Sequence, residues 1–487
     1  IATPPGSTIY ACAGSPVAGA QYSFTGGNGL DISVTLATTT VFSTLSGVGS
    51  LAGDTITITG DGTLTLVSRP DVYLYSNSGS AARLHNANPG SAGSVKVLTT
   101  FRASDAGDPA PGTDWGFSGY AAGLAAINDA DGSIELTLNN RIAGRRAGVL
   151  AEHNGVGDIS IAVGNAATGV EDGSITALGS NPDAHGLIVD HNGTGSITIT
   201  LNGNITSAAG DGVNATAAAD GAGIAVNLGD ARIDGGRNGI FADHDGATGG
   251  VLIQATVPNA PGTMTGQTGD GIRAENNGAA GIVITTAGGA ILGGELGISA
   301  ENTGDGGISI TTADGKVTGQ RSYGIGARNL GGGGVSITTG SGDISGGDGT
   351  GSFAISANGI GADDQGAGDL TITINDGAVT GDGSGIVAAN SGGGGLSITT
   401  NDGRVTGIGA NGIYARNALD TTDLTIQTKA GRVSGLDRGI YATNLGGGLL
   451  RITTGDGDIH GARDEGIRAI GGDAGAGVEV ALSGAAP

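Results

Sequence analysis

A short phrase recurs along most of this chain: glycine, an apolar residue, any residue, then alanine. Between Gly148 and Gly212 it appears once in a degenerate form, as GLIV at Gly186. Eight of the twelve steps between successive copies are 26 or 27 residues long. Repeats of this length indicate a solenoid, in which each repeat buries its apolar face only by stacking on its neighbours. The phrase begins at Gly123, Gly148, Gly186, Gly212, Gly239, Gly271, Gly297, Gly324, Gly359, Gly385, Gly412, Gly439 and Gly466.

Each repeat holds three short apolar stretches. The first is the Gly-Ile-x-Ala phrase, the second is typified by LSITT at 396–400, and the third by GRVTG at 403–407. All three alternate apolar with polar residues and are rich in Ile, Val and Thr, which is typical of half-buried strands. Phrases such as NLGGG and NDG separate them and have the composition of turns. Three strands and three turns per repeat predict an all-β fold, a parallel β-helix with three-stranded coils of about 27 residues.

The alternation predicts which side chains fill the interior. One inward column is formed by the isoleucines of the first strand and another by the valines of the third. Burying each such side chain stabilises the fold by roughly 1.5–3 kcal/mol. The predicted columns are Ile298, Ile325, Ile360, Ile386, Ile413 and Ile440, and Val317, Val379, Val405 and Val433.

The segment before Gly123 differs from the rest. It holds ten of the 15 aromatic residues and has irregular spacing, although it still contains alternating stretches such as LDISVTL at 30–36. A solenoid end exposes strand edges that need covering. We therefore expect residues 1–122 to form an N-terminal cap with irregular early coils, and residues 123–487 to form the regular β-helix.

Charge and cysteine content restrict the partners. The net charge is −24, so the chain repels phosphate backbones and we expect no nucleic-acid partner. Cys12 is the single cysteine, which excludes an internal disulfide and a cysteine-built metal site. We expect no cofactor, no metal and a monomer.

Coils of the form GIxAxNxGxGxLSITTxxGxVTG resemble the passenger domains of autotransporters, the type V secreted proteins of Gram-negative bacteria, and most of all the large Gly-rich passengers of alphaproteobacteria. The resemblance extends from about Gly123 to Ala469. It implies a right-handed parallel β-helix that is secreted or displayed at the cell surface after export through an outer-membrane β-barrel. That barrel is not part of this sequence, and neither is the Gly-Asp-Ser-Gly motif of the serine-protease passengers. The resemblance therefore implies location but no specific activity.

Two polar rows follow the Gly-Ile-x-Ala phrase. We interpret the asparagines of one row as a structural ladder, because stacked amides can hydrogen-bond from coil to coil. Near the N-terminal end acidic residues precede histidines, and paired carboxylates about 5 Å apart suit glycosidic chemistry, whereas carboxylates with histidines suit a divalent cation. These residues are candidate ligand-binding groups, and a solvated acidic edge is the alternative. The ladder is Asn276, Asn302, Asn329, Asn390, Asn417 and Asn444, and the candidate groups are Glu152, His153, Asp190, His191, Asp243 and His244.

Insertions mark a third class of candidate. Three steps, of 38, 32 and 35 residues, exceed the regular period, and extra residues in a solenoid become projecting loops that often bind partners. The predicted loop residues are Asn181, Pro182, Asp183, His185, Pro258, Pro261 and Phe353.

These observations favour a non-catalytic adhesin or host-interaction effector that contacts a host-cell surface protein, matrix or glycan. One alternative is a β-helical polysaccharide lyase or glycoside hydrolase that uses the edge of Glu152, Asp190 and Asp243. A second is an ice-binding β-helix, since hydroxyls recur in register on the second strand, for example Ser309 and Thr311.

Overall fold

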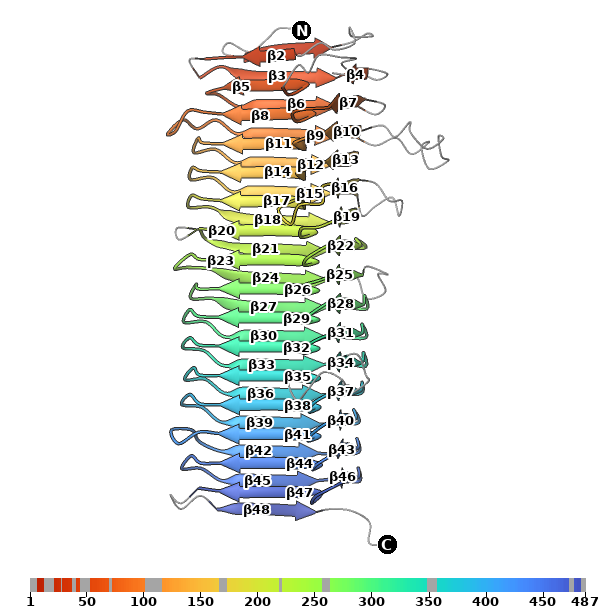
Figure 1. Cartoon of the computed structure of the whole chain (residues 1–487). Helices are drawn as coiled ribbons and strands as arrows, with labels where there is room; N and C mark the ends of the chain where they lie inside the picture. Colours follow the sequence, from red (N-terminus) through yellow and green to blue (C-terminus); the bar gives the residue numbers. More distant parts are fainter. Residues whose placement is uncertain are drawn as a thin grey trace, which may run out of the picture. The chain divides into compact units, whose positions relative to one another are not determined.

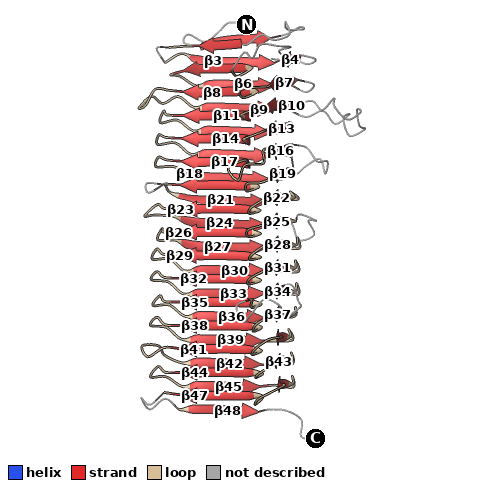
Figure 2. Ribbon diagram, in the orientation of Figure 1, coloured by secondary structure: helices blue, strands red, loops and turns tan. Residues whose placement is uncertain are grey.

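The computed structural model contains strands and turns, and its described residues include no helix (Figure 1, Figure 2). Successive coils of about 27 residues place their strands in three parallel sheets. The predicted right-handed parallel β-helix is thereby confirmed. The structure describes residues 7–12, 22–27, 29–36, 41–43, 53–69, 72–100, 116–165, 173–218, 221–255, 263–347, 357–472 and 477–482.

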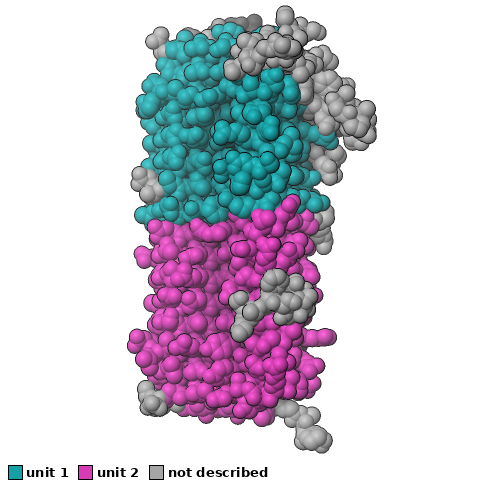
Figure 3. All heavy atoms as spheres, in the orientation of Figure 1, with its two compact units in different colours: residues 1–237, 241–248 teal, residues 238–240, 249–487 magenta. Residues whose placement is uncertain are grey.

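The chain divides into two compact units, coloured separately in Figure 3. Unit 1 comprises residues 1–237 and 241–248, and unit 2 comprises residues 238–240 and 249–487. Each unit contains strands of all three sheets, which we call sheets A, B and C. Sheet B holds the Gly-Ile-x-Ala strands, sheet A the LSITT-like strands and sheet C the shortest strands.

In unit 1 the strands of each sheet pair in parallel with the equivalent strands of neighbouring coils. Sheet A contains β1 (Ser7–Cys12), β3 (Asp31–Leu36), β6 (Leu64–Ser68), β9 (Val95–Thr99), β12 (Ile134–Leu138), β15 (Ile159–Val163), β18 (Ser196–Leu201) and β21 (Gly223–Leu228). Sheet B contains β2 (Tyr22–Thr25), β5 (Ile56–Gly60), β8 (Ala82–Asn86), β11 (Ala122–Asn128), β14 (Ala147–His153), β17 (His185–His191), β20 (Val213–Ala217) and β23 (Ile240–His244). Sheet C contains β4 (Val41–Ser43), β7 (Tyr73–Ser76), β10 (Gly116–Gly119), β13 (Arg141–Gly144), β16 (Ser174–Ala177), β19 (Asn204–Ser207) and β22 (Ile233–Gly235).

Unit 2 repeats the same order of strands. Sheet A contains β24 (Gly250–Ala255), β27 (Gly281–Thr286), β30 (Ile308–Thr312), β33 (Val335–Thr339), β36 (Leu370–Ile374), β39 (Leu396–Thr400), β42 (Leu424–Thr428), β45 (Leu450–Thr454) and β48 (Val478–Leu482). Sheet B contains β26 (Ile272–Asn276), β29 (Ile298–Asn302), β32 (Ile325–Asn329), β35 (Ile360–Asp364), β38 (Ile386–Asn390), β41 (Ile413–Asn417), β44 (Ile440–Asn444) and β47 (Ile467–Gly471). Sheet C contains β25 (Met264–Gly266), β28 (Ile291–Gly293), β31 (Val317–Gly319), β34 (Ile344–Gly346), β37 (Val379–Gly381), β40 (Val405–Gly407), β43 (Val433–Gly435) and β46 (Ile459–Gly461).

The predicted inward columns are confirmed. Ile298 pairs with Ile325, and the column continues to Ile440, with every one of its isoleucines fully buried. The valines of sheet C are buried in the same way. The register is kept even where the step is 35 residues, as between Ile325 and Ile360. Since a shift of one residue would turn every apolar side chain outward, burial fixes this register.

The segment before residue 123 also contributes to the sheets. In sheet B, β5 pairs with β8 and β8 with β11, so that Ile58, Leu84 and Ala126 form one buried column. Sheet A is likewise paired in register from β1 to β12. Described strands of the predicted cap region therefore follow the same three-sheet plan as the later coils.

Candidate functional site

The asparagine row of unit 2 forms a buried column at the last inward-facing position of the sheet B strands. The side chain of Asn276 donates to Asn302, Asn302 to Asn329, and Asn329 to Asp364, over 2.7, 2.8 and 2.9 Å. Asn390, Asn417 and Asn444 occupy the same column and instead donate to backbone carbonyls of the turns. All seven side chains are buried, so each satisfies polar groups inside the fold rather than at its surface.

Histidines take the same position in unit 1. The rings of His153 and His191 stack with centroids 4.9 Å apart, and both side chains are fully buried. The Nδ1 atom of His153 accepts the amide hydrogen of Gly155, while Nε2 lies 2.5 Å from the carbonyl oxygen of Gly132. His191 makes the equivalent contacts with Gly193 and Gly157.

This geometry contradicts the prediction that His153, His191 and His244 bind a ligand. His244 is also fully buried, with Nε2 3.2 Å from the carbonyl oxygen of Gly221. In His153 and His191 both ring nitrogens are engaged by backbone, so neither presents a lone pair to solvent. Burial lowers the pKa of both rings, which favours the neutral form. The sequence predicts these histidines in an exposed turn, whereas they lie at the inward-facing end of the strand. The pattern does not distinguish the two positions, because both accept polar residues.

The acidic residues lie on the outward side of the same strands. Glu152 and Asp190 are register neighbours on β14 and β17, and the next coil places Thr216 in this column. The hydroxyl of Thr216 donates to Asp190 over 2.7 Å. Burial raises the pKa of the Asp190 carboxyl, and the negative charge of Glu152 adds to the effect. Glu152 and Asp190 are thus brought together as predicted, and the third acidic residue, Asp243, lies on β23 beyond the coil of Thr216.

The predicted loop at 181–185 is only partly a loop. Asn181, Pro182 and Asp183 are exposed, and the side chain of Asn181 accepts the amide hydrogen of Asp183, as in an Asx-turn. His185 was predicted to belong to this loop, but it is the buried first residue of β17. The difference arises because β17 begins one residue before Gly186, the first residue of the repeated phrase. Pro258, Pro261 and Phe353 lie outside the described residues.

His185 belongs to a polar cluster around Asp211 that the repeat pattern did not reveal. Its Nδ1 accepts the amide hydrogen of Asp211 over 2.9 Å and lies 3.3 Å from a carboxylate oxygen of the same residue, which is fully buried. Arg237 contacts the same carboxylate with Nε at 2.8 Å and with a terminal nitrogen. Asn214 donates to it over 3.0 Å. Hydrogen bonding to Asp211 raises the pKa of Arg237 and keeps the guanidinium charged.

Three residues of unit 2 that directly precede a Gly-Ile-x-Ala phrase share a structural role. Asn238 accepts the amide hydrogen of Asp270, Asp270 that of Leu296, and Asn358 that of Ser384. Each bond joins one coil to the next. The sequence carries a signal for this role, because Asp, Asn or Ser recurs directly before the glycine of the phrase.

The exposed hydroxyls of sheet A are in register across four coils. Ser309, Ser336, Thr371 and Ser397 form one row, and Thr311, Thr338, Thr373 and Thr399 form the other. The second row continues into Gln427 on β42, and the first into Arg451 on β45. The array therefore covers β30, β33, β36 and β39.

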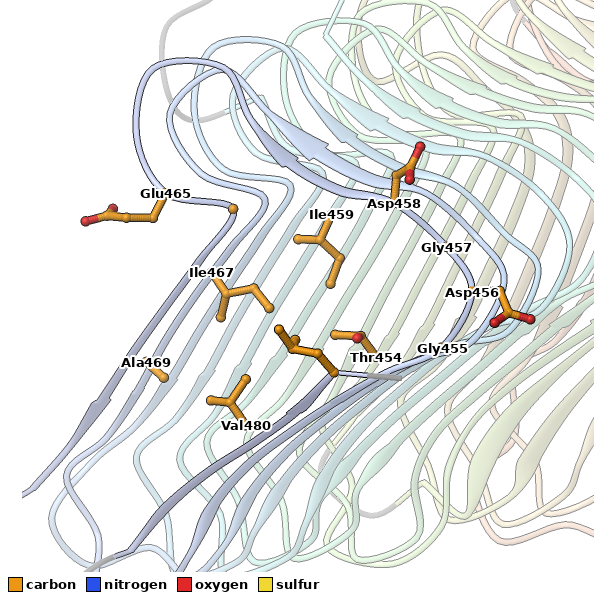
Figure 4. Close-up of a pocket in the computed structure, with 12 residues that line it drawn as sticks. Thr454, Gly455, Asp456, Gly457, Asp458, Ile459, Glu465, Ile467, Ala469 and Val480 are labelled. Atoms are coloured by element: carbon orange, nitrogen blue, oxygen red, sulfur yellow. The ribbon is translucent and has the colours of Figure 1, made fainter. Parts of the chain in front are cut away.

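A hollow lies at the C-terminal end of unit 2 (Figure 4). Ile459, Ile467 and Val480 extend into it, one from each of the three sheets. These are the inward-facing positions of their strands, so the hollow is the interior of the solenoid seen from its end. Asp456, Asp458 and Glu465 also line it, and none of its lining residues belongs to the predicted acidic edge.

Among the described residues, no group of three or more histidine, cysteine or acidic side chains is placed to hold a metal ion. The same part of the chain has no helix long and apolar enough to cross a membrane. Comparison of the chain with protein-family models, with curated proteins and with solved structures gives no match.

Proposed function

We propose that this chain is a secreted or surface-displayed passenger of the autotransporter type, acting as a non-catalytic adhesin or host-interaction effector. Its support is the contrast between the two sides of sheet B in unit 2. Inward positions are nearly constant, whereas the adjacent outward positions change from coil to coil. That outward column contains Ser299, Gly326, Gly361, Val387, Tyr414 and Tyr441.

A solenoid of this kind offers a broad binding surface whose chemistry is set coil by coil, without altering the core. The polar groups predicted to act on ligands are mostly committed to the fold. The histidines bind backbone, and Asp190 accepts from Thr216. This distribution favours recognition over catalysis, and a host-cell protein, matrix component or glycan is the partner class.

Binding of the purified chain to cultured animal and plant cells, to matrix proteins and to a glycan array tests this proposal. We expect saturable binding to at least one of these surfaces. Absence of binding to all of them, by a chain whose circular dichroism is that of a folded β-protein, would count against an adhesin.

A polysaccharide lyase or glycoside hydrolase is the second candidate, and the environment of Asp190 favours it. A half-buried carboxyl with a raised pKa beside a second carboxylate, one strand spacing away, suits a general acid and its partner. Release of reducing ends from a panel of polysaccharides, abolished by Asp190→Asn, would establish this activity. Equal background release by both proteins would exclude it for that panel.

A further inference from the structure

Cations are concentrated in the last coils of unit 2. Residues 404–468 contain eight of the 21 lysines and arginines but only seven of the 45 acidic residues, a net charge of +1 in a chain of −24. Two of these arginines project from sheet B, which in these coils also carries two tyrosines on its outward side. The charge of this region is therefore opposite to that expected from the whole chain.

The tyrosines form a pair. Tyr414 on β41 and Tyr441 on β44 are register neighbours, and their ring centroids lie 5.4 Å apart. Both side chains are partly exposed. Arg468 is the register neighbour of Tyr441 on β47, and its guanidinium carbon lies 5.8 Å from that ring. In the next coil, Arg468 thus occupies the position that the tyrosines occupy in the two preceding coils.

Arg416 lies on the same face of sheet B as Tyr414, Tyr441 and Arg468. It follows Tyr414 by two residues on the same strand, so both project from the same face of the sheet. Its register neighbours are Ala389 and Thr443, which carry no charge. Within the described part of the chain, no carboxylate lies at ion-pair distance from Arg416 or Arg468, and both side chains are exposed.

The nearby carboxylates are paired with other arginines. Arg438 lies 2.7 Å from Asp464 and 3.0 Å from Glu465, and its guanidinium also lies 5.3 Å from the ring of Tyr441. Asp437 lies 3.7 Å from Arg463. These pairs leave Arg416 and Arg468 without a direct ion pair beside two aromatic rings, and the charge of Arg468 acts on Glu465 only from a distance, where it helps to lower the pKa of that carboxyl.

We infer that this face, formed by Tyr414, Arg416, Tyr441 and Arg468, binds an acidic polysaccharide. Guanidinium groups pair with carboxylate or sulfate groups, and tyrosine rings offer apolar faces to the C–H faces of sugar rings. Adjacent coils are ~4.8 Å apart, which is close to the length of one sugar ring. An extended glycan running across the strands can therefore meet one coil with each sugar. The inference rests on the proposed function, since it names the ligand class and the face that an adhesin of this kind would use.

The test measures binding of the purified chain to heparin, which is sulfated, to polygalacturonate, which carries only carboxylates, and to neutral dextran. We expect binding to at least one acidic polymer, decreasing with added salt, and none to dextran. The double variant Arg416→Gln/Arg468→Gln should lose about tenfold or more in affinity. Replacing both tyrosines with alanine should also weaken binding.

A matched control changes Arg404→Gln/Arg432→Gln, which removes the same charge from the same region of unit 2. Both residues are exposed but directly precede the sheet C strands β40 and β43. We expect this variant to bind as the unmodified chain does. Equal losses in the two double variants would overturn the inference, as would binding to single-stranded oligothymidylate as tight as to the polysaccharides. A chain that adheres to cells but to no acidic polysaccharide overturns this inference alone, whereas adhesion to no surface overturns the proposed function as well.

Discussion

The rings of His153 and His191 lie stacked at 4.9 Å, with 9° between their planes, in a column that asparagine occupies elsewhere. Each histidine accepts a backbone amide hydrogen at Nδ1, as Asn390 and Asn444 accept one with their side-chain oxygens. Histidine and asparagine therefore perform the same role in closing the turn after the sheet B strand. They differ in that histidine can be protonated.

This difference predicts a loss of stability in mild acid. Burial lowers the pKa of both rings in the folded state, so as the pH falls below about 6.5 the unfolded chain takes up protons first. Their contribution to stability is complete above that pH and is lost progressively as the pH falls toward the folded-state pKa. The measurement is the urea midpoint of the full chain between pH 7.5 and pH 5.5.

The control is the double variant His153→Asn/His191→Asn, which keeps a side-chain acceptor in each coil. Its urea midpoint should change less over the same pH range, because the two groups that titrate have been removed. If both proteins showed the same pH dependence, the histidine column would not be its cause.

The amide ladder gives a second prediction. Asn302 accepts from Asn276, and donates to Asn329 and to the carbonyl oxygens of Gly304 and Gly306. Asn302→Ala removes one hydrogen-bond partner from each of these groups, although the Asn276 amide keeps its bond to Gly278, and the loss costs roughly 1–3 kcal/mol. Urea unfolding measures the loss. Asn277→Ala, at an exposed position in the preceding coil, should change stability by less than about 0.5 kcal/mol. Equal effects of the two substitutions would show that the ladder adds nothing.

The buried carboxylate of Asp211 gives a third prediction. Arg237→Gln removes its cationic partner, and since Arg237 is partly exposed we expect a loss of about 1–3 kcal/mol rather than the full penalty of a buried charge. Arg232→Gln is the control, because that arginine pairs with Asp234 at the surface, where ion pairs contribute about 0–1 kcal/mol. The loss of stability is measured by thermal unfolding of both variants. A loss for Arg232→Gln as large as for Arg237→Gln would show that the cluster around Asp211 does not stabilise the fold.

Much of the fold could be predicted because burial and period act together. Ile298 and Ile325 must face inward in consecutive coils, and the 27-residue step follows from that requirement. The same logic predicted the asparagine column and the neighbourhood of Glu152 and Asp190.

The remainder depends on geometry that the period does not contain. Whether His153 faces solvent or the interior depends on the residue at which its strand ends. The polar character of His153 alone does not show where that is. Arg237 and Arg232 look equivalent in the sequence, yet only Arg237 reaches Asp211, because the connection after β22 brings it back toward β17 and β20. Tyr414 and Arg416 become a surface only once the register of sheet B is known.

Glycine in the turns gives the last prediction, with two adjacent residues as each other's control. A methyl group added to Gly331 would overlap the carbonyl oxygen of Gly304 in the preceding coil. At Gly332 the nearest atom to such a methyl, the carbonyl oxygen of Asp305, is 3.4 Å away. Neither residue has a positive φ, so the difference lies in space between coils and not in backbone conformation.

Gly331→Ala should therefore destabilise unit 2 by roughly 1–3 kcal/mol, as expected for overpacking. Gly332→Ala should be neutral or slightly stabilising, because alanine lowers the entropy of the unfolded chain. Urea midpoints of the two variants measure the contrast. If they fell together, the glycines of this turn would serve backbone conformation, and the close approach of coils would not explain why the chain has so many.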